Sequence, residues 1–172
     1  MTRSILVFVA IILICSACSS NQDTDPANEK DEPLLQDLKA EQIDSLITSY
    51  KGEKALLVNV WATWCGPCVE EFPHIVDLQK KYADNLQVIF ISADFRSDRE
   101  RTLKFLKNHG VNWTTYFKKS NDQEFINELS EEWSGALPFT KMIAKNGEVV
   151  NSWENRADFN TFEKEIQRTI NH

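Results

Sequence analysis

The chain has 172 residues, of which 42% are hydrophobic and 10% aromatic, enough for one globular domain with a full hydrophobic core. Its formal net charge is −7, and its basic residues gather only in short pairs such as Lys80-Lys81, which argues against a nucleic-acid-binding surface. We attribute the acidic balance to solubility.

The N-terminus has the pattern of an export signal. Arg3 is followed by ten apolar residues, "ILVFVAIILI" (5–14), and then by small residues around two cysteines. This apolar run is about half of the roughly 20 residues that a membrane-spanning helix needs. A permanent transmembrane helix is therefore the weaker interpretation.

The end of this signal resembles the cleavage site of bacterial lipoproteins, in which a small residue precedes a cysteine that becomes lipidated. Cys18 follows Ser16 and Ala17 and fits this site, although Cys15 stands where the signal usually carries leucine. We therefore predict a lipoprotein signal peptide over residues 1–17 and lipidation of Cys18. Ordinary secretion with cleavage nearby is the alternative.

The segment that follows is polar. Residues 18–33 contain no large apolar side chain and many charged ones, so they cannot bury enough surface to offset the entropy of ordering. We predict a lipidated N-terminus and flexible linker over 18–33, and a single domain over 34–172.

The expected strands begin with this domain. The run "KALLVNVWA" (54–62) is nearly continuous in apolar and β-branched residues, as in a central strand buried on both faces. Asn146-Gly147 is the strongest short-range signal for a hairpin. The expected strands cover 34–38, 54–62, 86–94 and 112–117, followed by a hairpin over 138–154.

The expected helices alternate with these strands. In the segment 122–133, Phe125, Leu129 and Trp133 follow one another at four-residue steps and share one face of a helix. The expected helices cover 41–49, 66–82 with a kink at Pro73, 99–109, 122–133 and 159–170. This order predicts an α/β fold with a central mixed β-sheet flanked by helices on both faces.

Four cysteines, Cys15, Cys18, Cys65 and Cys68, form two C-x-x-C pairs that together could make a zinc site. The 46 residues between the pairs far exceed the roughly 15–20 of compact zinc ribbons, and the first pair lies in the signal, so we reject this site. Cys65 and Cys68 remain a redox pair, half of a metal site, or packing, because free cysteines also pack as small hydrophobes.

The segment "TWCGPC" (63–68) joins the central strand to the head of a helix that contains a proline, and a late X-Pro precedes the hairpin. This arrangement resembles the thioredoxin superfamily over about residues 34–171 and implies a thioredoxin-like fold. More narrowly, "VNVWATWCGPCVEEFP" (58–73) resembles the TlpA/ResA-like membrane-tethered thiol-disulfide oxidoreductases of the bacterial cell envelope.

The chemistry of the two cysteines also supports a redox pair. Side chains three residues apart on a helix have Cβ atoms about 5–6 Å apart, close enough for a disulfide after local adjustment. Cys65 lies at the helix N-terminus, where free amides and the helix dipole favour a thiolate, so we predict that Cys65 is the nucleophile. Cys68, one turn further in, is the predicted resolving thiol.

Several neighbours of the cysteines are predicted to contact the substrate. Trp64 borders the nucleophilic sulfur, and Gly66 and Pro67 separate the two cysteines. The resemblance implies that Leu137-Pro138 forms the superfamily's cis-proline loop, which packs opposite the dithiol and presents backbone to the substrate. Phe139 departs from the threonine that often follows this proline.

Resolution needs a proton acceptor near Cys68. The superfamily often uses a buried aspartate on the preceding strand, at a position that resembles Asn59, and asparagine cannot take a proton. Glu71 matches the acidic residue of the C-x-x-E-x-P continuation in ResA-like proteins, so we predict Glu71 as the acceptor. The alternatives are water as acceptor, and a Glu71 that is only an exposed helix carboxylate beside Glu70.

The predicted function is thiol-disulfide exchange outside the cytoplasm, reducing disulfides of cell-envelope proteins with electrons from an upstream membrane donor. We expect a monomer attached to a membrane by its lipid anchor, with no metal, no organic cofactor and no nucleic acid. The alternatives are net oxidation or isomerisation, a thiol peroxidase, and a redox-silent tethered binding or metal-carrier domain. The nearby resolving cysteine argues against the peroxidase, and copper carriers of this fold usually resemble C-x-x-x-C with a distant histidine.

Overall fold

The computed structural model describes residues 34–172, and the expected signal peptide, Cys18 and the linker lie outside the described residues. Within this part of the chain, six strands form one sheet in the order β1-β4-β3-β2-β5-β6. The strands are β1 Leu35–Leu38, β2 Ala55–Trp61, β3 Leu86–Ser92, β4 Thr115–Lys118, β5 Phe139–Ile143 and β6 Val149–Glu154. The helices are α1 Ile43–Ser49, α2 Gly66–Lys81, α3 Arg99–Asn108, α4 Asp122–Leu129 and α5 Phe159–Ile170.

The sheet is mixed, as the sequence predicts. Strands β1, β4, β3 and β2 run parallel to one another, whereas β5 runs antiparallel to β2 and to β6. Every residue of β2 is buried, which matches its continuous apolar sequence and its place inside the sheet. The hairpin between β5 and β6 turns at Gly147, whose φ of 91° favours glycine.

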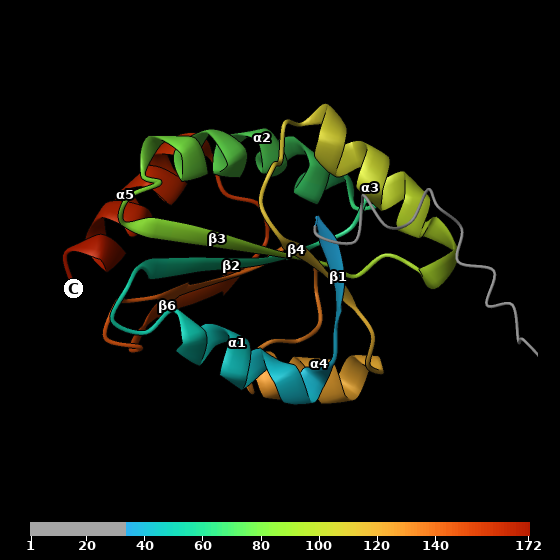
Figure 1. The fold of residues 1–172 in the computed structure, drawn as a ribbon, viewed down its shortest axis with the longest axis horizontal. Helices are drawn as coiled ribbons and strands as arrows, with labels where there is room; N and C mark the ends of the chain where they lie inside the picture. Colours follow the sequence, from blue (N-terminus) through green and yellow to red (C-terminus); the bar gives the residue numbers. More distant parts are fainter. Residues whose placement is uncertain (1–33) are drawn as a thin grey trace, which may run out of the picture.

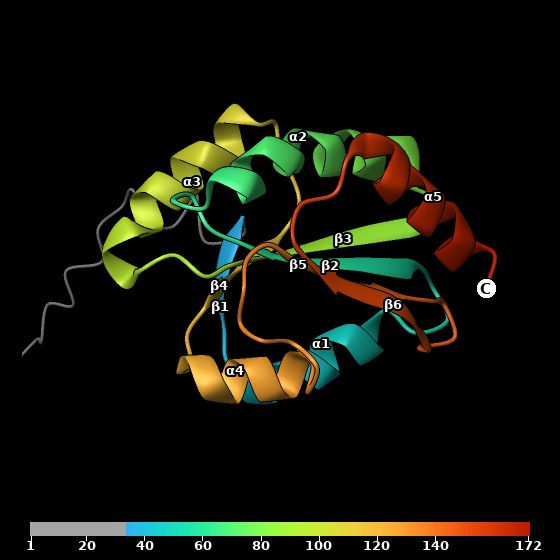
Figure 2. The same ribbon diagram turned by 180° about the vertical axis from the view of Figure 1, so that it is seen from behind.

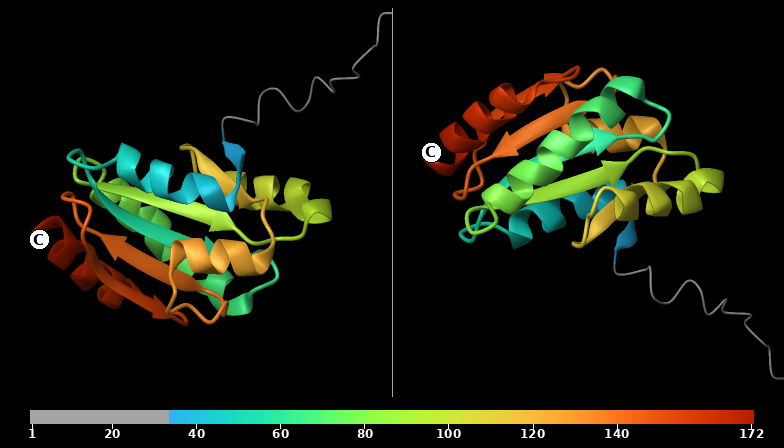
Figure 3. Two further views of the ribbon diagram at one scale, coloured as in Figure 1. Left: turned by 90° about the horizontal axis from the view of Figure 1, so that it is seen from below. Right: turned by 90° about the horizontal axis from the view of Figure 1, so that it is seen from above.

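The helices form a layer on each face of the sheet. Helices α2, α3 and α5 cover one face, and α1 and α4 cover the other (Figures 1 and 2). Figure 3 shows the layer of α1 and α4 from below and the layer of α2, α3 and α5 from above. The core is divided accordingly, with Phe72, Phe90 and Phe162 on the first side and Ile43, Phe125 and Phe139 on the second.

The helix expected over 122–133 is shorter than predicted. Helix α4 ends at Leu129, because Ser130 takes an extended conformation with φ −167° and ψ 125°. Trp133 is nevertheless buried, since its ring stacks on Phe139 and its indole N–H donates to the carbonyl of Ala136. The four-residue spacing therefore identified three buried residues, but only two of them lie on the helix.

Helix α2 brings the cysteine motif to one end of the sheet. Strand β2 ends at Trp61, and α2 begins at Gly66 with Pro67 in its first turn, where the missing backbone donor costs nothing. The helix continues past Pro73 to Lys81. Among residues 34–172, no helix combines the length and the apolar composition required to cross a membrane.

Candidate active site

Cys65 and Cys68 are joined by a disulfide, with their Cα atoms 5.3 Å apart. Cys65 is the N-cap of α2, and its sulfur accepts the backbone N–H of Cys68 at 3.3 Å. Cys65 is 6% exposed and Cys68 is 1% exposed. Both cysteines are therefore buried, and Cys65 is the more exposed of the two.

The segment that leads to Cys65 is fixed by a buried carboxylate that sequence reasoning missed. Asp94, just after β3, accepts hydrogen bonds from the backbone N–H of Thr63 at 3.0 Å and from its hydroxyl at 2.6 Å. Ser92 and Thr102 donate their hydroxyls to the same carboxylate at 2.8 and 3.0 Å. A polar residue at the carboxyl end of a strand parallel to β2 was the signal that could have identified Asp94.

Glu71 lies inside the protein, so the alternative of an exposed helix carboxylate is wrong. Its side chain is buried, at 1% exposure for the residue. One carboxylate oxygen accepts the side-chain amide of Asn59 at 2.9 Å, and the other accepts the backbone N–H of Ala157 at 3.0 Å. The neighbouring Glu70 is the exposed carboxylate and pairs with Arg156.

Burial raises the pKa of Glu71 to about 7. The hydrogen bonds from Ala157 and Asn59 and the positive charge of Arg156 act in the opposite direction, but they only partly offset the loss of hydration. A carboxyl group with this pKa changes its protonation state near neutral pH and can both accept and release a proton there.

Cys68 and Glu71 occupy one side of α2. They are three residues apart on the helix, which puts their Cβ atoms about 5–6 Å apart, and both are buried. Asn59 links this side to the sheet, because its amide also donates to the hydroxyl of Thr140 on β5 at 3.1 Å. The carbonyl oxygen of the Asn59 side chain has no hydrogen-bond partner within residues 34–172.

The peptide bond between Leu137 and Pro138 is cis, as the resemblance implied. The carbonyl of Pro138 accepts the backbone N–H of Asn155 at 3.0 Å, so this carbonyl is engaged inside the fold. Phe139, which replaces the more usual threonine, is buried against Trp133. Leu137 instead borders a pocket.

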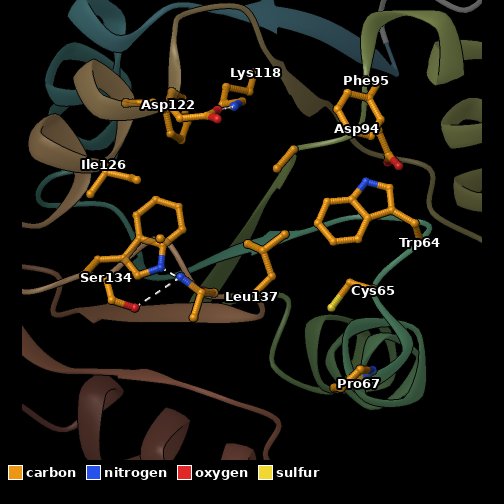
Figure 4. Close-up of a pocket in the computed structure, with 15 residues that line it drawn as sticks. Trp64, Cys65, Pro67, Asp94, Phe95, Lys118, Asp122, Ile126, Ser134 and Leu137 are labelled. Carbon is orange, nitrogen blue, oxygen red and sulfur yellow. Dashed lines mark hydrogen bonds and ion pairs between the residues drawn. The ribbon is translucent and has the colours of Figure 1, made fainter.

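This pocket has a volume of about 870 Å³ and opens beside the disulfide (Figure 4). Four predicted site residues line it: Trp64, Cys65, Pro67 and Leu137. Gly66 and Pro138 do not belong to its lining. Trp64 is 54% exposed and stacks on Phe95, which is 68% exposed, with ring centroids 6.4 Å apart.

Two further observations concern the residues around the site. The part of the chain from 34 to 172 holds no cluster of three or more His, Cys, Asp or Glu residues that could bind a metal ion. Trp61, directly before the motif, is 1% exposed and packs on Phe72 at a centroid distance of 4.6 Å, so it belongs to the core.

A mixed sheet with two helical layers, a C-x-x-C disulfide at a helix N-terminus and a cis-proline loop defines a thioredoxin-like protein. The family model described as Redoxin matches residues 21–165, and the chain belongs to this family. The expected resemblance to the thioredoxin superfamily and its ResA-like members is confirmed.

Among its relatives, the "Thiol-disulfide oxidoreductase ResA" of Bacillus subtilis is 27% identical over 117 residues, which cover 68% of this chain and 60% of that protein. The "Thioredoxin-like protein YneN" of the same organism is 42% identical over 60 residues, or 35% of each chain. The chain thus spans between about a third and two thirds of the length of these relatives.

Solved structures agree on the fold. A putative thiol:disulfide interchange protein DsbE from Chlorobium tepidum is 25% identical, with a TM-score of 0.58 over 72% of this chain and 84% of that one. A DsbF homologue from Corynebacterium diphtheriae, 19% identical, reaches a TM-score of 0.61 over 71% of this chain and 75% of that one, and this likeness concerns the fold alone.

Proposed function

We propose that this protein is a thiol-disulfide oxidoreductase that reduces disulfides of cell-envelope proteins. The observation that carries the proposal is the Cys65–Cys68 disulfide at the N-terminus of α2, next to an open pocket. The names of its ResA relatives describe the same class of activity. The cysteine pair supplies the chemistry without a further cofactor.

The reaction consists of two thiol-disulfide exchanges. In the reduced protein, the Cys65 thiolate attacks one sulfur of the substrate disulfide, whose S–S bond breaks as a mixed disulfide forms and the first substrate thiolate leaves. Cys68 then loses its proton and attacks the sulfur of Cys65, which releases the second substrate thiolate. The substrate gains two electrons, and the protein returns to the disulfide form described above. A dithiol donor must then reduce it again.

The helix N-terminus and Glu71 assist different steps. At Cys65, the free amides and the dipole of α2 stabilise the thiolate, so the first attack occurs at neutral pH. At Cys68, burial disfavours an unaided thiolate, and the ionised carboxylate of Glu71 one turn away accepts the proton. Asn59 and Ala157 position that carboxylate through their hydrogen bonds.

The setting of this activity is part of the same proposal. The apolar run over 5–14 and the small residues before Cys18 support export, cleavage after residue 17 and attachment to a membrane through a lipid on Cys18. The segment 18–33 then serves as a tether for the monomeric domain that begins at Leu34. Its partners are disulfide-bearing envelope proteins and an upstream membrane electron donor.

The test is reduction of insulin disulfides by the chain without residues 1–17, with dithiothreitol as electron donor. Cys65→Ser should abolish the activity, and Cys68→Ser should accumulate a mixed disulfide, because Cys65 can still attack but nothing resolves the intermediate. Peroxide consumption measured in parallel should be negligible. Rapid Cys65-dependent peroxide turnover without disulfide reduction would instead identify a thiol peroxidase.

A further inference from the structure

The pocket beside the disulfide is lined mainly by apolar residues, and its charged residues are Asp94, Lys118 and Asp122. Lys118 at the end of β4 forms an ion pair with Asp122, the first residue of α4. In the view of Figure 4 this pair lies across the pocket from Cys65. A substrate segment that extends from Cys65 along the pocket therefore meets a charged group.

Lys118 and Asp122 differ strongly in their contact with water. The side chain of Lys118 is 16% exposed, whereas that of Asp122 is 80% exposed. The burial of Lys118 lowers the pKa of its ammonium group, because lost hydration disfavours the charged form. The exposed Asp122 only partly compensates for this loss.

The next residue along the chain behaves differently. Lys119 is 45% exposed at its side chain and pairs with Asp37 at 3.0 Å, together with Arg96 and Arg99 on the same carboxylate. Successive side chains of an extended strand point to opposite faces, so only Lys118 lines the pocket. Lys119 thus provides a neighbouring lysine of the same charge outside the site.

We propose that Lys118 binds a carboxylate of the substrate, so that the protein prefers disulfides in extended segments with apolar residues next to the cysteine and an acidic side chain further along. This inference rests on the proposed function and adds the substrate class. An incoming carboxylate displaces Asp122 from Lys118. The ammonium group of Lys118 then pairs with a carboxylate that is shielded from water inside the pocket, unlike the exposed Asp122.

The other charges of the pocket permit this exchange. When Asp122 leaves Lys118, it remains in the first turn of α4, where the helix dipole favours a negative charge and water is available. The other acidic residue of the lining, Asp94, is saturated by donors from Thr63, Ser92 and Thr102 and lies 3.9 Å from Arg101. Its charge is therefore compensated within the fold.

The test uses synthetic peptides in which one cysteine is disulfide-bonded to 2-mercaptoethanol, an uncharged thiol. The cysteine is followed by leucines and then by either glutamate or glutamine after roughly one to four residues, since an extended chain advances about 3.3 Å per residue. Pre-reduced protein is mixed with each peptide, and the second-order rate constant of its oxidation is measured. The products are the protein disulfide, the peptide thiol and free 2-mercaptoethanol.

At the best spacing, the glutamate peptide should react about tenfold faster than its glutamine counterpart, because a hydrogen bond to a charged group gives roughly this gain. Lys118→Met should reduce this ratio to near one, Lys118→Arg should largely restore it, and the control Lys119→Met should leave it unchanged. Asp122→Asn should increase the ratio by removing the competing carboxylate.

The failure of this inference is distinguishable from failure of the proposed function. If neither peptide oxidises the protein, the proposed function itself fails. If both react at equal rates at every spacing, or if Lys118→Met keeps the glutamate preference, Lys118 is not the carboxylate-binding residue. A glutamine peptide that reacts faster than its glutamate counterpart would also overturn the inference.

Discussion

The side-chain amide of Asn59 donates a hydrogen bond to the carboxylate of Glu71 at 2.9 Å and so connects the central strand β2 to helix α2. In its thioredoxin-like relatives, the strand position resembling Asn59 often carries the acid itself. Here the strand carries the amide and the helix carries the carboxylate, and both residues are buried. The single buried acid of this arrangement is the basis of the first three predictions.

Glu71→Gln should slow the resolution of mixed disulfides while it leaves the first attack by Cys65 unchanged. Removal of a positioned general base costs about 10²–10⁴-fold in the step that it assists. Because the pKa of Glu71 is about 7, the loss should be greatest between pH 7 and about 8.5, and small near pH 5, where Glu71 already holds a proton. Stopped-flow measurement of both steps checks this, and equal resolution rates across this pH range would leave water as the acceptor.

The same pKa makes the stability of the protein depend on Glu71. The folded pKa of about 7 lies above the ordinary value of 4.5, so the stabilising contribution of Glu71 is complete below pH 4.5 and is lost as the pH rises through 7. The full loss is on the order of 3 kcal/mol in unfolding free energy. Urea unfolding of wild type and Glu71→Gln at several pH values should show wild type losing stability relative to the variant over this range.

Asn59→Asp should give two carboxyl groups that share one proton. Asn59 lies within hydrogen-bond distance of Glu71, and two like charges this close raise one pKa of the pair. The pH at which resolution reaches half its maximum rate should therefore shift upward in this variant. In the Glu71→Gln background, the new aspartate should instead partly restore resolution, and a double variant as slow as Glu71→Gln alone would contradict a proton-accepting role at this position.

Thr63→Val should loosen the segment that carries Trp64 and Cys65. The hydroxyl of Thr63 donates to Asp94 at 2.6 Å and accepts from Arg101 at 2.9 Å, and valine keeps the shape but not these bonds. We expect a loss of about 2 kcal/mol in unfolding free energy, since the bond to a buried charged group is broken. Thr63→Ser is the matched control, because it keeps the hydroxyl and should stay close to wild type in urea unfolding.

Cys18→Ala tests the expected anchor. The variant should escape lipidation and processing by the lipoprotein route, and any matured protein should move from the membrane fraction to the soluble fraction. Cell fractionation followed by immunoblotting measures this distribution. Membrane association that survives alkaline extraction of the variant would show that the apolar segment is retained in its place.

Much of this protein follows from local sequence patterns. The continuous apolar run of β2, the Asn146-Gly147 turn and the proline in the first turn of α2 each act through neighbouring residues, so the sequence alone predicts them. The same holds for the spacing of Cys65 and Cys68, which a helical turn brings within disulfide distance. Helix α4 shows the limit of such patterns. Trp133 continues the four-residue spacing, but the helix has already ended before Ser130.

Tertiary structure decided the rest. Whether Glu71 was a surface charge or a buried acid depended on Asn59 and Ala157, which are 12 and 86 residues away along the chain. Asp94 approaches Thr63 only because β3 pairs with β2, and the pocket forms only where Trp64, Leu137 and Lys118 converge from separate elements. Burial and long-range pairing set the charge state of a side chain, and neither is encoded within a short segment.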